Sequence, residues 1–535
     1  MRQSLIPFAP LKRPPFRAIW TASFVSNLGT LIQGVGAAWL MTEITRSADM
    51  VALVQTAMSL PVMLFAIFGG AIADSFDRRR VMLGAQVFML VAAASLTALA
   101  IAGMVGAWTI LALTFLIGCG TAIFNPSWHA SIGDLVPRDE IPAAVGLNSL
   151  GFNLSRSIGP AIGGAVVALV GATAAFGLNA LSFIPIVVAL VVWRPASTSM
   201  PVPRESIGAA ISTGLRYLAM SPPVLSVLVR SFAFGFTSIV VVALLPVVST
   251  NLLGGGAFTF GMLLSCYGLG AVVAAISSSL LRTVLNAENI LRLAIGSFAA
   301  SAGLCATGSV WLTALGLVLG GAGWVLGQSL FNVSVQLSTP RWVVGRAISA
   351  FQTAAFGGMA AGSWFWGVIG EGFGLQQALI AAAFAILVTM ALGLFLRLPP
   401  DSGEKLMPSG QWREPSVALE IEPRSGPIHV EIHYRISPQN TAAFLRLMVR
   451  RRRVRRRDGA QGWTLLRDLH DPDRWIERYR TARWADYVRH NLRRTKVDAE
   501  IFEQLKSLHS GLEPPVVHRY LERPAGWSEP GIAGP

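Results

Sequence analysis

The chain has 535 residues, of which 53% are hydrophobic and only 13% are charged. Soluble domains carry about 25% charged residues, so this composition excludes a disordered chain and argues against a soluble globular enzyme. Residues 1–400 contain 19 of the 43 Lys and Arg residues and only 10 of the 28 Asp and Glu residues. These counts predict a membrane domain followed by a small charged soluble domain. We interpret the net charge of +15 as membrane orientation, with no nucleic-acid partner.

Twelve apolar stretches are long enough to cross a bilayer as helices, which takes about 20 residues. They are predicted at 18–42, 50–73, 81–103, 107–131, 143–170, 174–193, 223–250, 257–281, 289–308, 311–335, 345–370 and 373–396. The predicted fold is an all-α membrane protein with two six-helix bundles, at 18–193 and 223–398. Residues 1–17 are polar and Pro-rich, which favours a short cytoplasmic tail over a cleavable signal.

The basic residues predict the orientation of these spans. Of the 19 Lys and Arg residues before residue 401, 16 fall on one side of the predicted membrane and only Arg46 on the other, while Arg156 and Arg230 lie inside spans. By the positive-inside rule both termini face the cytoplasm, as expected for a multi-pass protein of the bacterial inner membrane. The connection 194–222 is then cytoplasmic, and it contains an amphipathic stretch that can lie at the interface with Arg204 and Arg216 near lipid headgroups.

The two halves resemble each other in sequence. FNPSWHASIGDLVPRDE (124–140) parallels FNVSVQLSTPRW (331–342), and each joins the fourth predicted span of its half to the fifth. Parallel repeats of this kind build transporters whose substrate site lies between the repeats near the bilayer midplane.

The connection after the second span reads GAIADSFDRRR (70–80). It resembles the hallmark loop of the major facilitator superfamily, G-x-L-A-D-R-x-G-R-[RK], at Gly70, Asp74, Arg78 and Arg79. The resemblance implies a transporter fold and a conformational latch in which an acid beside several Arg residues forms and breaks contacts. The alternative is that these Arg residues only anchor the loop on the cytoplasmic side.

The fifth span carries SRSIGPAIGG (155–164), which is similar to the superfamily's antiporter motif G-x-x-x-G-P-x-x-G-G. Gly159, Pro160, Gly163 and Gly164 match, and such small residues let a neighbouring helix approach closely. The motif is associated with exporters, and together with the preceding loop it resembles the enterobactin-exporter-like branch of transmembrane secretion effectors. Ordinary small-residue packing is the alternative.

Arg156 lies about 14 residues into its span, and a charge at that depth usually faces a cavity or a partner. We expect a substrate or coupling role for it, with a structural clamp on backbone carbonyls as the alternative. The resemblance implies that spans one, four, seven and ten line the cavity, and interhelical hydrogen bonding is the alternative for each polar residue there. The full candidate set for the cavity is Arg156, Asn153, Asn27, Gln33, Asn125, His129, Gln328 and Asn332.

The energy source follows from what the sequence contains. It has no GxxxxGK[ST] motif and no metal-type Cys or His spacing, so no cofactor or metal is expected. The resemblance implies coupling to protons, although no Asp or Glu lies deep in a span. The predicted function is a secondary active exporter of a small organic molecule, a siderophore or drug, and not an enzyme.

The last part of the chain alternates between strand and helix patterns. A linker at 399–427 precedes a predicted β-α-β-β-α-β order at 428–436, 441–457, 462–470, 474–480, 484–509 and 516–523. This order predicts a ferredoxin-like α+β domain at 428–525 and resembles the antibiotic-biosynthesis-monooxygenase type of dimeric barrel, so dimerisation is one of the roles open to this tail. Seven Arg residues in 450–457 either hold it to anionic lipid or form a solvated helix face.

Three other functions remain open. An importer would share the fold, a cofactor-free monooxygenase would use the tail, with His490 as the best site candidate, and a membrane sensor would move no solute. Regulation or dimerisation is the favoured role of the tail.

Overall fold

The computed structural model describes residues 8–45, 47–137, 140–194, 207–340, 343–398, 412 and 414–523. The chain divides into two compact units. The first, called the membrane unit, comprises Met1–Ser199, Pro223–Val335 and Gly345–Pro399. The second, called the tail unit, comprises Met200–Pro222, Gln336–Val344 and Pro400–Pro535.

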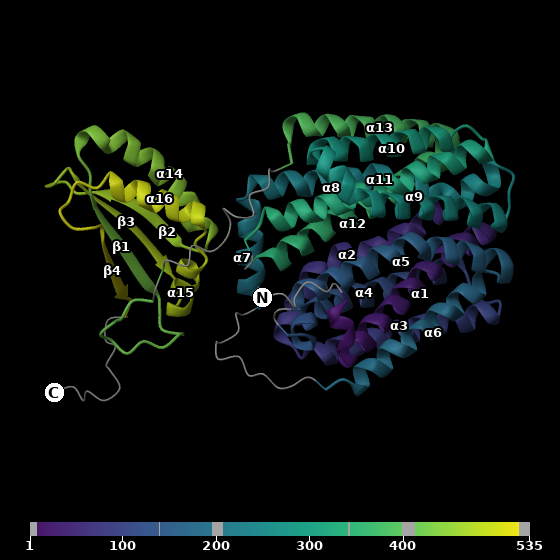
Figure 1. Ribbon diagram of the computed structural model, residues 1–535, viewed down its shortest axis with the longest axis horizontal. Coiled ribbons are helices and arrows are strands. Elements are labelled where there is room, and N and C mark those ends of the chain that lie inside the picture. The colour runs from purple at the N-terminus through teal and green to yellow at the C-terminus, as the bar shows by residue number, and fades with distance from the viewer. Residues whose placement is uncertain are drawn as a thin grey trace. The chain divides into compact units, whose positions relative to one another are not determined.

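The membrane unit consists of long helices in two groups (Figure 1). The first group is α1 (Pro14–Thr45), α2 (Ala48–Ser75), α3 (Arg78–Ile101), α4 (Ala107–Leu135), α5 (Ile141–Val170) and α6 (Ala172–Val192), with a short 3-10 turn η1 (Ala9–Lys12) before α1. The second group is α8 (Pro222–Val247) with the π-helical extension η2 (Val248–Leu252), α9 (Ala257–Val284), α10 (Ala287–Cys305), α11 (Val310–Leu337), α12 (Val344–Phe373) and α13 (Leu375–Phe395). Every predicted span coincides with one of these helices.

Ten of the described helices are long and apolar enough to cross a membrane. The remaining two predicted spans correspond to α10 and α12, and a count of twelve crossings stays a prediction. Large apolar side chains such as Leu181, Val188, Ile276 and Phe384 are exposed on the outside of the helices. Apolar exposure of this extent is typical of helices that face lipid.

The tail unit contains a four-stranded antiparallel sheet with the strand order β2-β3-β1-β4. The strands are β1 (Ile428–Arg435), β2 (Gln461–Arg467), β3 (Arg474–Thr481) and β4 (Val516–Leu521). The helices are α14 (Thr441–Arg457), which follows the 3-10 turn η3 (Pro438–Asn440), α15 (Trp484–Leu492) and α16 (Lys496–Ser507), and α14 and α16 cover one face of the sheet (Figure 1). Alternate residues of β1, from Ile428 to Tyr434, are buried in a core beneath these helices. Trp412 and Ile421, which fall in the predicted linker, pack against the same core.

One predicted element of the tail is wrong in detail. The single helix expected at 484–509 is divided into α15 and α16. The Thr495 hydroxyl accepts a hydrogen bond from the backbone N–H of Asp498, and the Asp498 carboxylate accepts one from the backbone N–H of Thr495. This capping box starts a new helix, which is why the sequence does not continue as one.

The amphipathic stretch between the two helix groups forms α7 (Ile207–Ala219) and belongs to the tail unit. Its Tyr217 is only 2% exposed, and the Arg457 guanidinium of α14 lies 5.3 Å from the ring centre. The interfacial position predicted for this helix stays a prediction, and Arg204 lies outside the described residues.

Candidate functional site

Arg156 lies halfway along α5, between the two groups of helices. Its guanidinium carbon is 5.6 Å from the ring centre of Phe152, one turn earlier on the same helix. It is 5.1 Å from the ring centre of Trp324 on α11, which belongs to the second group. Tyr267 of α9 is a further electrostatic neighbour from that group. Arg156 therefore connects helices of both halves through aromatic faces.

Among the described residues Arg156 makes no ion pair and no hydrogen bond, and its side chain is partly exposed. A guanidinium has five N–H donors, and aromatic faces stabilise its charge without using those donors. The donors of Arg156 are thus available to a ligand with oxygen acceptors.

The polar residues near Arg156 continue along one face of α5. Asn148, Phe152 and Arg156 are spaced by four residues and so lie on the same side of the helix. Asn148 accepts a hydrogen bond from Nε1 of Trp128 at 2.6 Å, and its amide nitrogen lies 3.3 Å from Nδ1 of His129. The exposed His129 is therefore tied to α5 by Asn148, two turns from Arg156.

The other predicted cavity residues divide by position. Gln328 and Asn332 follow Trp324 at four-residue steps on α11, so they share the face that reaches Arg156. Asn27 on α1 and Asn125 on α4 are half-buried and have no hydrogen bond within the described residues.

Two further candidates do not join this group. Gln33 is buried and accepts a hydrogen bond from Asn179 of α6, so interhelical bonding accounts for it. The side chain of Asn153 lies outside what the structure describes.

The glycines of the fifth predicted span face two different neighbours. A Cβ on Gly159 or Gly163 would lie 2.9 or 3.0 Å from Leu31 or Val35 of α1. A Cβ on Gly164 would lie 2.5 Å from the Cα atom of Gly261 on α9, in the other half. These glycines, with Pro160 inside the helix, therefore permit close packing within the first half and between the halves.

The loop after α2 holds its arginines in two ways. Nη1 of Arg78 donates to the Asp134 carboxylate of α4 at 2.9 Å and to the carbonyl of Ala130 at 3.0 Å. Nε and Nη2 of Arg79 donate at 2.7 Å each to carbonyls at the end of α6. The surroundings of Gly70 and Asp74 lie outside what the structure describes. For Arg78, the structure shows an acidic partner, Asp134, that lies outside the predicted motif.

Sequence reasoning missed an ion pair in the second half. Arg230 of α8 donates from Nη1 and Nη2 to the two carboxylate oxygens of Glu288, each at 2.8 Å, and its side chain is 2% exposed. Glu288 lies in the first turn of α10. The available signal was one Arg inside an apolar span with one Glu at the start of a later span.

Besides the contacts of Arg156 and Gly164, a hydrogen bond at the start of α2 also joins the two halves. The Glu371 carboxylate of α12 accepts a hydrogen bond from the backbone N–H of Ala48 at 2.8 Å. A carboxylate at a helix N-terminus is stabilised by the helix dipole and by the unpaired N–H groups there. A Cβ on Gly367 of α12 would lie 2.7 Å from Ala52, so the two helices pack closely at this end.

The tail contains a buried charged cluster that the run of arginines did not predict. Arg451 and Arg455 lie one turn apart on α14 and point into the unit, whereas Arg450, Arg452, Arg453 and Arg456 are exposed. Nε of Arg451 donates to one Glu477 oxygen at 2.7 Å, and Nε of Arg455 donates to the other at 3.0 Å. Burial alone would raise the pKa of Glu477, but the two arginines hold it far below its usual range.

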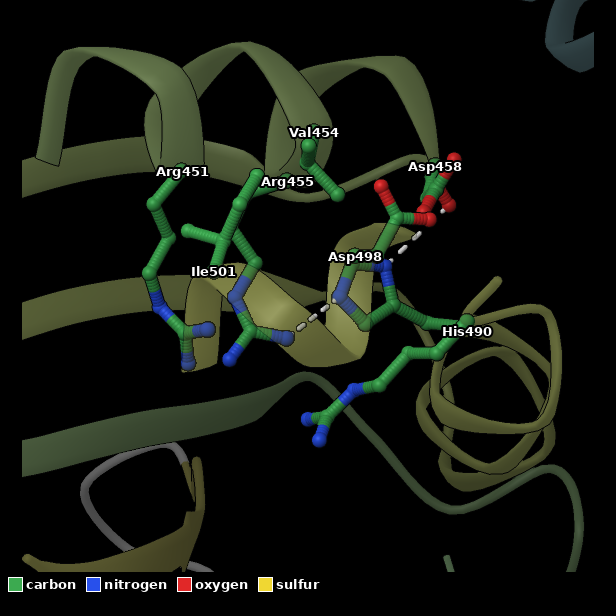
Figure 2. Close-up of a pocket in the computed structure, with 8 residues that line it drawn as sticks. Arg451, Val454, Arg455, Asp458, His490, Asp498 and Ile501 are labelled. Atoms are coloured by element: carbon green, nitrogen blue, oxygen red, sulfur yellow. Dashed lines mark hydrogen bonds between the residues drawn. The ribbon is translucent and has the colours of Figure 1, made fainter. Parts of the chain in front are cut away.

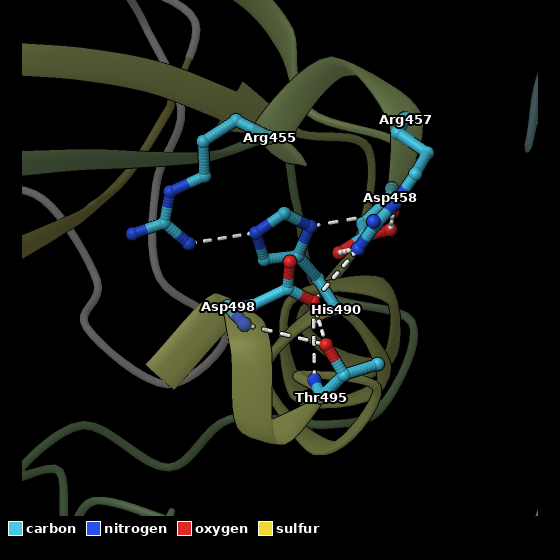
Figure 3. Close-up of polar contacts among 6 residues, drawn as sticks. All are labelled: Arg455, Arg457, Asp458, His490, Thr495 and Asp498. Atoms are coloured by element: carbon cyan, nitrogen blue, oxygen red, sulfur yellow. Dashed lines mark hydrogen bonds and ion pairs between the residues drawn. The ribbon is translucent and has the colours of Figure 1, made fainter. Parts of the chain in front are cut away.

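His490 lies beside Arg455 of this cluster (Figure 3). Its Nε2 accepts a hydrogen bond from Nη1 of Arg455 at 2.7 Å, and its Nδ1 donates to the carbonyl of Asp458 at 3.2 Å. Burial and the charges of Arg455 and Arg494 hold the pKa of His490 well below its usual range. The histidine is thus a buried hydrogen-bonding residue, and the described residues contain no group of His, Cys, Asp or Glu that can hold a metal.

Comparison with known proteins places this geometry in a family. A family model described as transmembrane secretion effector matches residues 5–525. The chain is 24% identical over 400 residues to the multidrug efflux pump Tap of Mycolicibacterium fortuitum, and the aligned region covers 72% of this chain and 96% of Tap. It is 28% identical over 408 residues to the enterobactin exporter EntS of Shigella boydii serotype 18, and the aligned region covers 72% of this chain and 95% of EntS.

Solved structures share the fold at low sequence identity. A bacterial homologue of the human lysosomal transporter Spinster, in an inward-facing and unoccupied conformation, has a TM-score of 0.56 at 14% identity, covering 72% of this chain and 97% of its own. A POT family transporter in complex with 5-aminolevulinic acid has a TM-score of 0.57 at 13% identity, covering 71% of this chain and 95% of its own. The relatives are transporters and not enzymes, as expected. The chain is therefore a multi-pass transporter of the major facilitator type and belongs to the transmembrane secretion effector family.

Proposed function

We propose that this protein exports a small organic molecule across the bacterial inner membrane by alternating access of its two halves. Arg156 is the observation that carries the proposal. It is a partly exposed cation at mid-helix depth, between α5 of one half and α11 of the other, and its N–H donors have no partner among the described residues. Substrate sites of repeat-built transporters lie between the repeats near the midplane.

The chemistry around Arg156 indicates the kind of substrate. Aromatic rings at 5.1 and 5.6 Å suit a flat or ring-containing molecule, and free guanidinium donors suit carboxylate, phenolate or carbonyl oxygens. An oxygen-rich siderophore or an anionic drug has both features. The names of the two relatives, an enterobactin exporter and a multidrug efflux pump, support the same class.

The finer assignments belong to this proposal as well. We infer twelve crossings with both termini in the cytoplasm, since an even count agrees with the distribution of Lys and Arg. We infer coupling to protons, and a latch at Gly70, Asp74, Arg78 and Arg79 that is supported by the Arg78–Asp134 ion pair. We assign the tail a ferredoxin-like fold on the strength of its strand order β2-β3-β1-β4.

Transport into inside-out membrane vesicles tests the function, with iron-free enterobactin as the oxygen-rich probe and ethidium as a cationic contrast. An exporter accumulates its substrate in inside-out vesicles when a proton gradient is applied. We expect Arg156→Ala to lower the initial rate for enterobactin at least tenfold, and Arg156→Lys to restore little because a point charge replaces the guanidinium fork.

Arg80→Ala is the matched control, because Arg80 is exposed at the start of α3 and its loss should leave the rate unchanged. Accumulation only in right-side-out vesicles would show an importer instead. A normal rate for Arg156→Ala would remove Arg156 from the substrate path.

A further inference from the structure

We infer that the tail unit contains a binding site for a small oxyanion, a phosphate or carboxylate group, formed by Arg451, Arg455 and Arg494. The site is separate from the transport path proposed above and does not depend on it.

The first observation is a cavity in the tail unit with a volume of about 10 Å³ (Figure 2). It is lined by Arg451, Val454, Arg455, Asp458, His490, Arg494, Asp498 and Ile501. A space of this size holds about one water molecule. A larger oxyanion would need one wall to move, and Arg494 is the half-buried member of the three arginines.

The second observation is that two arginines that line the cavity have buried N–H donors with no partner among the described residues. Arg451 is 5% exposed and Arg455 is 2% exposed, and Nη2 of each is buried without a hydrogen bond. Figure 2 shows the two guanidinium groups side by side beneath α14. Leaving a buried charged donor unsatisfied is costly, so such groups call for an explanation such as an ion.

The third observation is the balance of charge at this end of the cavity. Arg451 and Arg494 both lie over the ring of Phe502, at 5.2 and 5.9 Å. Arg451 and Arg455 share one carboxylate, that of Glu477, so the three arginines have one acid bound among them in the cited ion pairs. Burial, followed by the charges of Arg455 and Arg451, lowers the pKa of Arg494 to about 10, as expected for a guanidinium in a locally positive environment.

The acids at the other end of the cavity do not supply the missing charge. Asp458 and Asp498 are both bound to Arg457, at 2.7 and 2.8 Å, and Asp498 also closes the capping box with Thr495 (Figure 3). His490 is neutral and already accepts from Arg455. The three arginines therefore keep a local excess of positive charge and free N–H groups, the arrangement that guanidinium groups use to bind carboxylate or phosphate.

Equilibrium dialysis of the full-length protein tests this site. The protein is held in a non-ionic detergent, so that no lipid phosphate competes, and in chloride buffer at constant ionic strength. The probes are radiolabelled inorganic phosphate and radiolabelled formate in separate series. We expect saturable binding of at least one of them with one site per chain, and the anion that binds more tightly defines the ligand class.

Arg494→Met is the main variant because Arg494 is only half-buried and bonds Asn491 on its own segment. We expect it to weaken binding at least tenfold. Arg451→Met should do the same, and Arg453→Met is the matched control, since Arg453 is exposed on the same helix.

Hydrogen exchange of β1 and β3 peptides checks that each variant keeps the folded tail. The inference is overturned if neither anion binds saturably to the wild type, or if folded Arg494→Met and Arg451→Met bind as the wild type does.

Discussion

The arginines of the two units are held in different ways. In the tail, Arg451 and Arg455 share the fully buried carboxylate of Glu477, whose Oε1 also accepts from Trp463 at 3.2 Å. In the membrane unit, Arg156 lies near two aromatic rings and makes no ion pair among the described residues. A guanidinium that shares a buried carboxylate stabilises the fold and keeps only its remaining N–H groups for a ligand, whereas Arg156 uses none of its donors within the described residues.

The membrane unit contains both arrangements. Arg230 is bound bidentately by Glu288 and also donates to the carbonyl of Leu396 at 3.0 Å. These contacts join α8 to α10 and to Leu396, the residue that follows α13. Position within the fold, and not residue type, thus separates a structural arginine from a functional one.

The largest effect should come from removing the acid of the tail cluster. Glu477→Gln leaves Arg451 and Arg455 without the buried carboxylate that they share. Breaking a buried ion pair in this way costs about 3–5 kcal/mol. Hydrogen exchange of β3 and α14 peptides in the full-length protein measures this loss, because amides exchange faster when the tail unfolds more often.

The same residue predicts a dependence on pH. Because the folded pKa of Glu477 is depressed, its contribution is complete above the unfolded value of about 4.3 and is lost as the pH falls below it. Protection of β3 should therefore decline below about pH 4 in the wild type. Glu477→Gln should lack this part of the decline, and Arg453→Met should keep it. An equal slope in Glu477→Gln would contradict the assignment.

The next prediction compares the two arginines of the membrane unit, Arg230 and Arg156. Arg230→Met removes the buried partner of Glu288, which keeps a 4.0 Å ion pair with Arg292. The change should cost about 3 kcal/mol, at the low end for a buried pair, because the Glu288 side chain is 19% exposed. Arg156→Met removes no ion pair and should change stability by less than about 1 kcal/mol.

A thiol-reactive dye that reports exposure of Cys119, Cys266 and Cys305 measures the apparent Tm of both variants in detergent. A drop of about 5–10 °C is expected for Arg230→Met and little change for Arg156→Met. Equal drops would mean that Arg156 is a structural clamp, the alternative that the sequence leaves open.

Sequence patterns predicted the features that depend on local chemistry. Helix positions follow from the length of apolar runs, and Gly159, Gly163 and Gly164 were identifiable because close packing requires small residues. The strands of the tail follow from alternating burial, as in β1.

Patterns failed where a side chain chooses among distant partners. The run of arginines in α14 did not reveal that Arg451 and Arg455 turn inward, because Glu477 lies on a strand that only the tertiary fold brings near. Gln33 was assigned to the cavity because nothing in the sequence shows that Asn179 lies opposite it. The partner of Arg78 was missed for the same reason.

The smallest effect tests how the aromatic rings support Arg156. Phe152→Leu removes one ring at 5.6 Å while keeping an apolar side chain at a partly exposed position. An exposed cation–π contact contributes about 0.5–1 kcal/mol, so the KM for enterobactin should rise about two- to fivefold with little change in Tm. Phe384→Leu on α13 is the matched control, since its ring is 66% exposed and should leave the KM unchanged. If Phe152→Leu abolished transport as fully as Arg156→Ala, the ring would contact the substrate itself. An unchanged KM would show that Trp324 alone holds the guanidinium in place.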